Sequence, residues 1–316
     1  MVSVDDIRTA ARRLQGIAFR TPLVECGPLG ESVGVEARLK CESLQRSGSF
    51  KIRGAYNCIS QLDPAARTNG VVAYSSGNHG QGVALAARLL GTRATIVMPT
   101  TALTVKQDGA KRLGADVVLE GTTSLERRAK AEEIARERGL AVVPGFDHPH
   151  IVAGQGTVGL EVAEQWPEVD TVLVPIGGGG LISGMAIALK NAHRHVRIVG
   201  VEPAGARSMA LALKEGAPVT IPKPQSIADG LTASRVSQLT LTLAQRYVDD
   251  VIDVTDDAIR EASAFLLQRA KWVVEFSGAA TVAALLSGVL GNRGKRVVAV
   301  ISGGNIDVAQ IHSLLS

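Results

Sequence analysis

Short apolar runs alternate with amphipathic stretches along most of this chain. β-Branched and aliphatic residues gather at 37–41, 70–74, 94–98, 171–175 and 296–301, which predicts buried strands. Between these runs, apolar residues recur every three or four positions opposite charged ones, the pattern of a helix with one buried face. Strands that alternate with helices are typical of mostly parallel sheets covered by helices. The sequence therefore predicts an α/β protein.

The middle of the chain has the pattern of a separate folding unit. Its predicted helices lie at 80–90, 104–113 and 124–138. A glycine follows each of them, and glycine readily takes the left-handed conformation of a helix C-cap. Outside this unit, helices are predicted at 3–15, 52–62, 156–165, 181–191, 257–269 and 278–290. We expect a small mobile domain at 69–146 and a large domain formed by 1–68 and 147–316.

Composition excludes several classes of protein. Of the 316 residues, 46% are hydrophobic and 20% charged, which is ordinary for a globular protein. Aromatic residues are only 3%, which argues against a stacking surface for single-stranded nucleic acid. There is no apolar run of membrane-spanning length and no apolar signal core at the amino terminus. The three cysteines form no C-x-x-C pair. We expect a cytoplasmic protein with no nucleic-acid or membrane partner.

One lysine stands where a strongly hydrated ammonium group is unusual. Lys51 follows the short segment Ser47-Gly48-Ser49-Phe50 at a predicted helix start and is flanked by apolar residues. Loss of hydration lowers the pKa of a lysine, and the neutral amine is a nucleophile that forms imines with carbonyl groups. Most lysines beside a turn are solvated surface residues, so this segment alone is weak support for such chemistry.

A run of four glycines, Gly177, Gly178, Gly179 and Gly180, lies between a predicted buried strand and a predicted helix. Without side chains, the backbone amides can approach an anion closely, and the following helix adds the positive end of its dipole. The run lacks the lysine of a Walker A loop and does not have the G-x-G-x-x-G spacing. It indicates a phosphate site, with a flexible structural turn as the alternative.

Two further polar segments follow predicted strands. Ser75 to Gly80 joins a strand to a helix, where hydroxyls and amides suit a carboxylate and the Asn78 amide suits a ring hydroxyl. An N-capped helix start is the simpler alternative. Ser302 to Asn305 follows the last strand, at the end where ligands of parallel sheets bind, or forms a simple tight turn.

Taken together, these segments and Ala153-Gly154-Gln155-Gly156-Thr157 resemble the fold-type II pyridoxal-phosphate enzymes. The resemblance is closest to the serine/threonine dehydratase and serine racemase group and runs from about Ile7 to Asp307. It implies the tryptophan synthase beta-like fold, with two domains that each contain a mostly parallel twisted sheet. It also implies pyridoxal 5′-phosphate as cofactor and a homodimer or higher homo-oligomer.

The resemblance assigns roles to particular residues. Lys51 corresponds to the lysine that forms a Schiff base with the cofactor, and Phe50 to a residue beside the ring. Asn78 would bind the ring hydroxyl, Ser302 the pyridine nitrogen, and Gly177–Gly180 the phosphate. The substrate carboxylate would lie among the segment Ser75, Ser76, Gly77 and His79. A supporting position for His79 is the alternative to a direct role.

The implied reaction is deamination of L-threonine or L-serine by β-elimination, which yields a 2-oxo acid and ammonia. Ser76 leaves a racemase open, because in serine racemases a serine at this position protonates the face opposite the lysine. A hydroxyaspartate dehydratase is a further alternative. A protein that binds amino acids or cofactor without turnover would not need Lys51.

A divalent-cation site is also implied by the resemblance. Glu202 and the Ala206 carbonyl correspond to two of its ligands, for Mg²⁺ or Ca²⁺. Ser208 stands where the group has an acidic residue. A single glutamate after a strand is more often structural, so both interpretations remain open.

Overall fold

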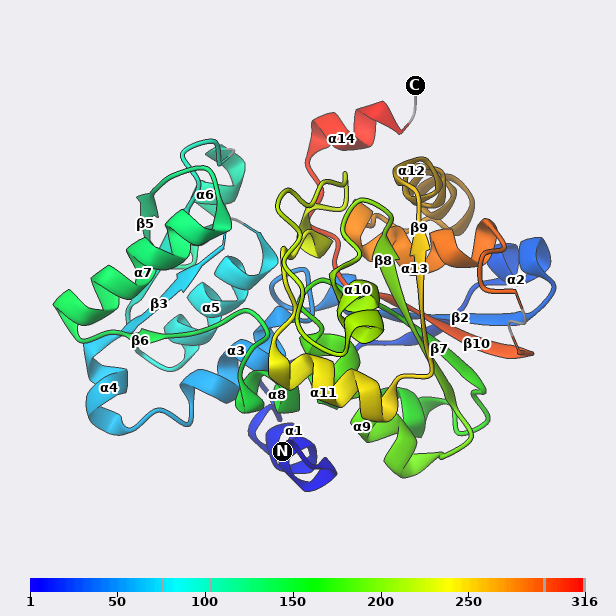
Figure 1. The fold of residues 1–316 in the computed structure, drawn as a ribbon, viewed down its shortest axis with the longest axis horizontal. Helices are drawn as coiled ribbons and strands as arrows, with labels where there is room; N and C mark the ends of the chain where they lie inside the picture. Colours follow the sequence, from blue (N-terminus) through cyan, green and yellow to red (C-terminus); the bar gives the residue numbers. More distant parts are fainter. Residues whose placement is uncertain (76, 103, 292–293, 315–316) are drawn as a thin grey trace.

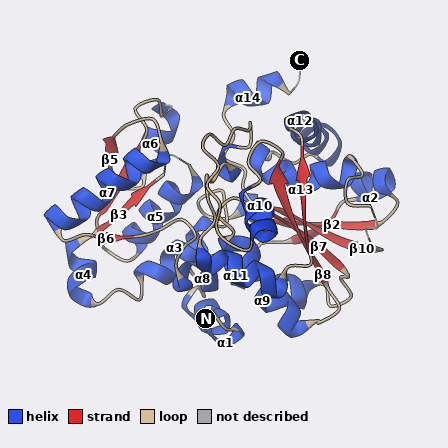
Figure 2. Cartoon of the chain, viewed as in Figure 1, coloured by secondary structure: helices blue, strands red, loops and turns tan. Residues whose placement is uncertain are grey.

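The computed structural model of this protein describes residues 1–75, 77–102, 104–291 and 294–314. Within these residues the strands form two separate sheets, each flanked by helices (Figures 1 and 2). The larger sheet has the order β1-β2-β10-β7-β8-β9 and the smaller the order β5-β4-β3-β6. All neighbouring strands are parallel except β1 and β2. The predicted α/β architecture is therefore present.

The larger sheet is buried on both faces. Its strands are β1 (Leu23–Glu25), β2 (Glu36–Cys41), β7 (Thr171–Pro175), β8 (Arg197–Pro203), β9 (Asp250–Val254) and β10 (Arg296–Ile301). Alternate residues of β10 face opposite sides: Val297 and Ala299 pack with α2, α12 and α13, whereas Val298 and Val300 pack with α8, α9 and α11. A strand buried on both sides is necessarily a continuous apolar run, and this is why its pattern was visible in the sequence.

The helices around the larger sheet come from both ends of the chain. They are α1 (Val4–Arg13), α2 (Gly27–Val33), α8 (Pro149–Gln165), α9 (Gly180–Ala192), α10 (Ser208–Glu215), α11 (Gln238–Tyr247), α12 (Asp256–Phe265), α13 (Phe276–Leu286) and α14 (Val308–Ser313). Short 3₁₀ turns lie at Glu42–Leu44 and Asp229–Leu231, and a π-helical turn at Leu266–Ala270 extends α12.

The smaller sheet and its helices come from the middle of the chain. Its strands are β3 (Val71–Tyr74), β4 (Ala94–Met98), β5 (Asp116–Leu119) and β6 (Ala141–Val142). The associated helices are α3 (Lys51–Ile59), α4 (Pro64–Asn69), α5 (Asn78–Leu89), α6 (Thr104–Arg112) and α7 (Ser124–Arg138). One face packs against α3 and α5, and the other against α7. Gly139 ends α7 with a φ of +63°, the left-handed cap expected of it.

One helix differs clearly from the prediction. Helix α8 begins at Pro149, seven residues before the predicted start at 156, because the proline and two glycines, Gly154 and Gly156, made its first half look irregular. These glycines permit close helix packing. A Cβ on Gly154 would lie 2.6 Å from the Arg53 carbonyl oxygen of α3, and one on Gly156 would lie 2.8 Å from the Gly184 carbonyl oxygen of α9. Close contact with two helices thus outweighs the low helix propensity of glycine.

A buried ionic cluster fixes α3 to α8. The Arg53 guanidinium donates to Glu42 at 2.8 Å and to Glu161 at 2.6 Å. The Lys40 ammonium donates to the second oxygen of Glu161 at 2.6 Å, and the Thr21 hydroxyl donates to Glu42 at 2.5 Å. Two cations and two carboxylates balance, which makes the burial of four charges tolerable. The cluster holds the helix whose first residue is Lys51.

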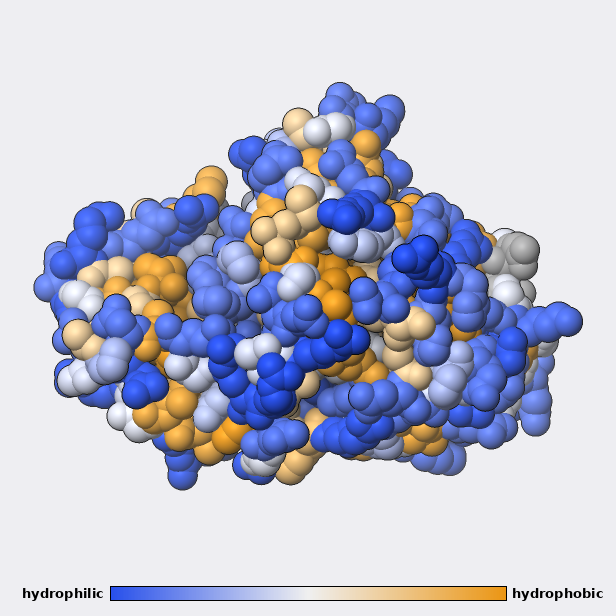
Figure 3. Space-filling model, turned by 90° about the horizontal axis from the view of Figure 1, so that it is seen from below, coloured by the Kyte–Doolittle hydropathy of each residue, from blue (hydrophilic) through white to orange (hydrophobic). Residues whose placement is uncertain are grey.

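The exterior is dominated by polar and charged side chains. Seen from below, apolar residues reach the surface in patches between them (Figure 3). No helix among the described residues combines the length and the apolar character needed to cross a bilayer.

Replacing Arg53 with leucine should lower the free energy of unfolding by about 3–5 kcal/mol, because the buried Glu42 loses its cationic partner and the partly buried Glu161 loses one of two. Urea unfolding followed by circular dichroism measures this change. Arg8→Ala is the matched control: its pair with Asp5, at 2.9 Å, is exposed and should contribute about 0–1 kcal/mol. Equal effects of the two substitutions would show that the cluster does not anchor α3.

Candidate active site

Two loops distant in sequence meet at the carboxyl end of the larger sheet. Parallel pairing of β2 with β10 places Cys41 opposite Ile301, so the segments that follow these strands emerge together. The Phe50 amide donates to the Ser302 carbonyl at 3.2 Å, and the Gly304 amide donates to the Gly48 carbonyl at 2.9 Å. Backbone hydrogen bonds thus join the loop that carries the candidate lysine to the loop that carries the candidate serine.

Lys51 is the first residue of α3, and its side chain is partly buried. Its Nζ donates to the Gly145 carbonyl at 3.0 Å and lies 5.1 Å from the centre of the Phe50 ring. Loss of hydration lowers the pKa of Lys51 to about 8, and no carboxylate among the described residues offsets that loss. A substantial fraction of this amine is therefore neutral near physiological pH.

Asn78 begins α5 and is held at both ends of its side-chain amide. Its Oδ1 accepts from Asn305 Nδ2 at 2.7 Å, and its Nδ2 donates to Glu275 Oε1 at 2.5 Å. Asn305 Nδ2 also donates to the Ser47 carbonyl at 2.9 Å, which connects this network to the lysine loop. Burial raises the pKa of Glu275 to about 8.

The loop before α5 has one predicted residue outside the described part of the chain, Ser76. The Ser75 hydroxyl accepts from the Gly77 amide at 3.3 Å. His79 is buried, and its Nε2 lies 2.9 Å from the Val143 carbonyl. Burial, together with the charge of Lys51, lowers the pKa of His79 to about 3, so the ring is neutral and Nε2–H donates to that carbonyl. This geometry favours the supporting position for His79 over a direct role.

The four-glycine turn joins β7 to α9. Only Gly179 has a positive φ, +89°, and as N-cap of α9 it offers no side chain to the free amides of the first turn. A Cβ on Gly178 would lie 2.1 Å from the Phe146 ring, and one on Gly177 would lie 2.9 Å from the Gly230 carbonyl oxygen. The glycines are thus required for packing, and they leave the amino end of a 13-residue helix able to bind an anion.

Ser302 is 4% exposed, and its hydroxyl lies 3.5 Å from the Ser277 carbonyl, a long contact for an O–H donor. This hydroxyl therefore keeps most of its capacity to bond a ligand. It carries no charge, so it would not hold a partner nitrogen in its protonated form.

The donor set predicted for a divalent cation does not fit a metal ion. Both oxygens of Glu202 accept backbone amides at the start of α10, from Met209 at 2.7 Å and Ala210 at 2.9 Å. The Ala206 carbonyl accepts the Ser208 amide at 3.0 Å. The described residues contain no group of three or more acidic, histidine or cysteine side chains suited to a metal. Glu202 is an anchor for α10, the structural alternative.

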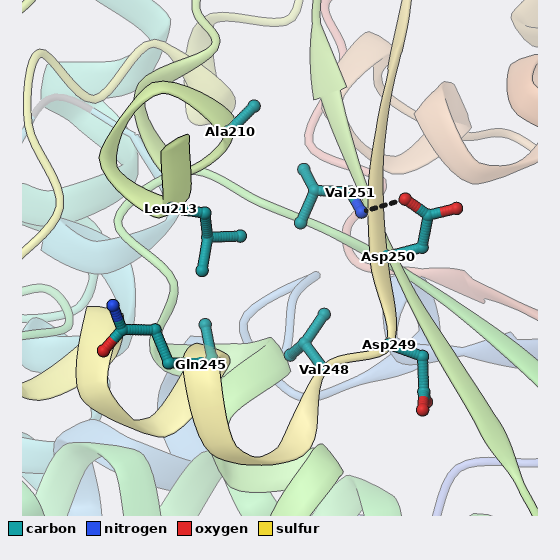
Figure 4. Close-up of a pocket in the computed structure, with 8 residues that line it drawn as sticks. Ala210, Leu213, Gln245, Val248, Asp249, Asp250 and Val251 are labelled. Atoms are coloured by element: carbon teal, nitrogen blue, oxygen red, sulfur yellow. Dashed lines mark hydrogen bonds between the residues drawn. The ribbon is translucent and has the colours of Figure 1, made fainter. Parts of the chain in front are cut away.

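A hollow in the described structure lies elsewhere. It is formed by α10, α11 and the edge strand β9, and Leu213, Val248 and Val251 contribute apolar side chains (Figure 4). None of its lining residues belongs to the glycine turn or to the loops around Lys51. This hollow is therefore separate from the segments around Lys51 and the glycine turn.

Comparison with known proteins identifies the family. The family model described as "Pyridoxal-phosphate dependent enzyme" matches residues 14–303. The chain belongs to the pyridoxal-phosphate dependent enzymes. L-threonine ammonia-lyase of Thermotoga maritima is 44% identical over 100% of this chain and 79% of its own length. The catabolic L-threonine dehydratase TdcB of Escherichia coli K12 is 41% identical over 99% of this chain and 96% of its own length. Maize serine racemase, a solved structure, is 38% identical and superposes with a TM-score of 0.95. The match covers 99% of this chain and 97% of the maize protein.

These findings confirm the resemblance inferred from the motifs, the fold class and the cofactor, pyridoxal 5′-phosphate. The geometry of the site suits this cofactor. The open amides at the start of α9 fit a phosphate, and the partly neutral amine of Lys51 fits an aldehyde. Both lie on the segments that the sequence singled out.

Two polar residues of the site lack a sequence-based prediction of their own. Asn305 lies inside the segment Ser302 to Asn305, but its contact with Asn78 across 227 positions has no local signal. Glu275 stands between two apolar residues, Val274 and Phe276, where a single glutamate is unremarkable. Only the tertiary structure brings its carboxylate to Asn78.

In cofactor-free protein, the rate at which an amine reagent modifies Lys51 should rise with pH and approach a plateau above about pH 8. Below the pKa of about 8 the ammonium form is unreactive, and above it the neutral amine dominates. Peptide mapping by mass spectrometry follows the modification, with Lys51→Arg to verify the assignment. A rate that is still climbing steeply two pH units higher would contradict desolvation of this lysine.

Proposed function

We propose that this chain deaminates L-threonine and L-serine by β-elimination to a 2-oxo acid and ammonia. The observation that carries the proposal is the partly buried Lys51 amine with its lowered pKa, in a chain 44% identical to an L-threonine ammonia-lyase. When bound, the cofactor supplies an aldehyde that bonds amines and a ring that accepts electrons. The protein must then hold the ring and the substrate and move a proton.

Lys51 is the proposed base. Its Nζ is the amine that would hold the aldehyde carbon of the cofactor, and it would be free to act as a base once the substrate amine is bound there instead. A neutral amine with a pKa of about 8 then accepts the α-proton of the substrate. The β-hydroxyl lies on the neighbouring carbon, so the proton that Lys51 has taken up can be passed to it and it leaves as water. A water molecule then hydrolyses the remaining enamine to the 2-oxo acid and ammonia.

The other residues bind and orient. Gly177 to Gly180 and the start of α9 would hold the phosphate, Phe50 would pack beside the ring, and Asn78 would donate to the ring oxygen. Ser302 would offer the ring nitrogen a neutral hydroxyl, so electron density would remain available to expel the β-hydroxyl. Ser75, Gly77 and the first amides of α5 would hold the substrate carboxylate. His79 would support this loop through its hydrogen bond to the Val143 carbonyl.

The proposed domain division follows the two sheets. Residues 69–146 would move as a small domain against 1–68 and 147–316, and thereby open and close the site between them. An ion pair at 2.7 Å between Lys106 of α6 and Asp229 of the larger part joins the two. We also propose a homodimer in the cytoplasm, where three free and buried cysteines suit a reducing environment.

Purified protein supplied with pyridoxal 5′-phosphate should convert L-threonine and L-serine to 2-oxo acids, measured by a coupled reductase assay. Lys51→Ala should lower kcat by at least about a hundredfold, because the base is lost. Lys111→Ala, an exposed lysine on α6, is the control and should leave turnover unchanged. If the bound cofactor absorbs visible light but neither amino acid is turned over, the proposed reaction is overturned, whereas the assignment of the chain to its family still stands.

Racemisation of serine is a second candidate. It is favoured by the likeness to maize serine racemase and by a serine at position 76. Two proton carriers on opposite faces are needed to invert a carbon centre, and Ser76 would be the partner of Lys51.

Ser76→Ala should abolish any interconversion of L- and D-serine while leaving release of ammonia from L-serine within a few-fold of the unmodified protein. Chiral chromatography and an ammonia assay on the same sample separate the two reactions. Ser75→Ala is the neighbouring control. Racemisation that survives in Ser76→Ala would refute the two-face arrangement.

A further inference from the structure

Glu275 is a buried carboxyl group that the proposed chemistry leaves without a task. It is 8% exposed and stands at the N-cap of α13, yet its side chain caps no amide of that helix. Its hydrogen bond to Asn78 at 2.5 Å crosses 197 positions of sequence. Within the described residues no cation forms an ion pair with it. Two charges act on it from a distance, Asp229 raising its pKa and Lys106 lowering it.

The surrounding backbone leaves room for this carboxyl group. A Cβ on Gly303 would lie 2.2 Å from Glu275 Oε1 and 3.0 Å from Asn78 Nδ2. The Glu275 amide in turn donates to the Gly303 carbonyl at 3.3 Å. Glycine directly after Ser302 thus allows the carboxyl group to reach the amide of α5 beside the end of β10.

The polarity of the network determines which end of the Asn78 amide faces which partner. The Ser47 carbonyl can only accept, so Asn305 presents its NH₂ group, and that group meets Asn78 Oδ1. The opposite end of Asn78 is then NH₂, and it meets an oxygen of Glu275. One of its two hydrogens is used there, which leaves the second for another acceptor.

We propose that Glu275 is a positioning residue, which holds the Asn78 amide so that its remaining N–H is donated to the ring oxygen of pyridoxal 5′-phosphate. This inference rests on the role proposed above for Asn78. Without Glu275 the amide keeps only the contact to Asn305 and turns more freely, so its donation to the ring oxygen weakens. Glu275 acts through Asn78 and does not itself contact the cofactor.

A double-mutant cycle tests the proposal through cofactor affinity and needs no turnover. The full-length protein is freed of cofactor and titrated with pyridoxal 5′-phosphate, with the dissociation constant read from visible absorbance and from quenching of tryptophan fluorescence. Glu275→Ala should bind about tenfold more weakly, the loss expected when one buried hydrogen bond no longer holds the donor. Glu275→Gln keeps an acceptor oxygen but cannot ionise, and should bind about threefold more weakly.

The decisive comparison is made in Asn78→Ala. In that background neither Glu275→Ala nor Glu275→Gln should weaken cofactor binding further, because the residue through which Glu275 acts is absent. If Glu275→Ala does not fold, the isosteric Glu275→Gln measured in both backgrounds decides alone. Glu202→Gln is the matched control: it removes another buried carboxylate with two amide partners and should change the melting temperature but not the dissociation constant.

Equal weakening in the two backgrounds, or unchanged affinity of both Glu275 variants beside intact Asn78, would overturn the positioning role. Either result would leave the proposed deamination standing. Conversely, absence of turnover in the unmodified protein would not alter the outcome of the binding cycle.

Discussion

Parallel pairing of β2 with β10 is the constraint on which the site depends. Residues 41 and 301 are opposite one another in this register, so the loops after the two strands run together and bond backbone to backbone. If β2 slipped by one residue against β10, its side chains would exchange faces of the sheet and Phe50 would move away from Ser302. The sheet therefore positions a lysine and a serine that lie about 250 residues apart in the chain, a separation no local sequence feature could encode.

Stability and reactivity are assigned to different residues in the first turn of the same helix. Arg53 is fully paired with carboxylates and anchors α3 to α8, whereas Lys51, two residues earlier, has only a carbonyl partner among the described residues. Complete pairing keeps the guanidinium charged, and incomplete hydration lowers the pKa of the amine to about 8. A helix held firmly by its ionic cluster can thus carry an amine in a position that costs stability.

The elements with continuous apolar patterns were predictable, and those shaped by long-range contacts were not. Strands at 94–98, 171–175 and 296–301 match β4, β7 and β10, because burial on both faces leaves an unmistakable run. The first half of α8 was missed, since its glycines serve contacts with α3 and α9. Lys51 and the glycine turn stood out locally. Glu275 did not, because its importance arises from one amide brought to it by the fold.

The site relies on dipoles where many anion sites use full charges. The glycine turn offers backbone amides at the end of α9, Ser302 a neutral hydroxyl, and His79 a ring kept neutral by burial. Burial brings the pKa of Lys51 down, and that of Glu275 up, to about 8 in each case. Groups whose charged and neutral forms are close in free energy exchange protons readily. Desolvation, more than any ion pair, therefore makes this region suited to moving a proton near neutral pH.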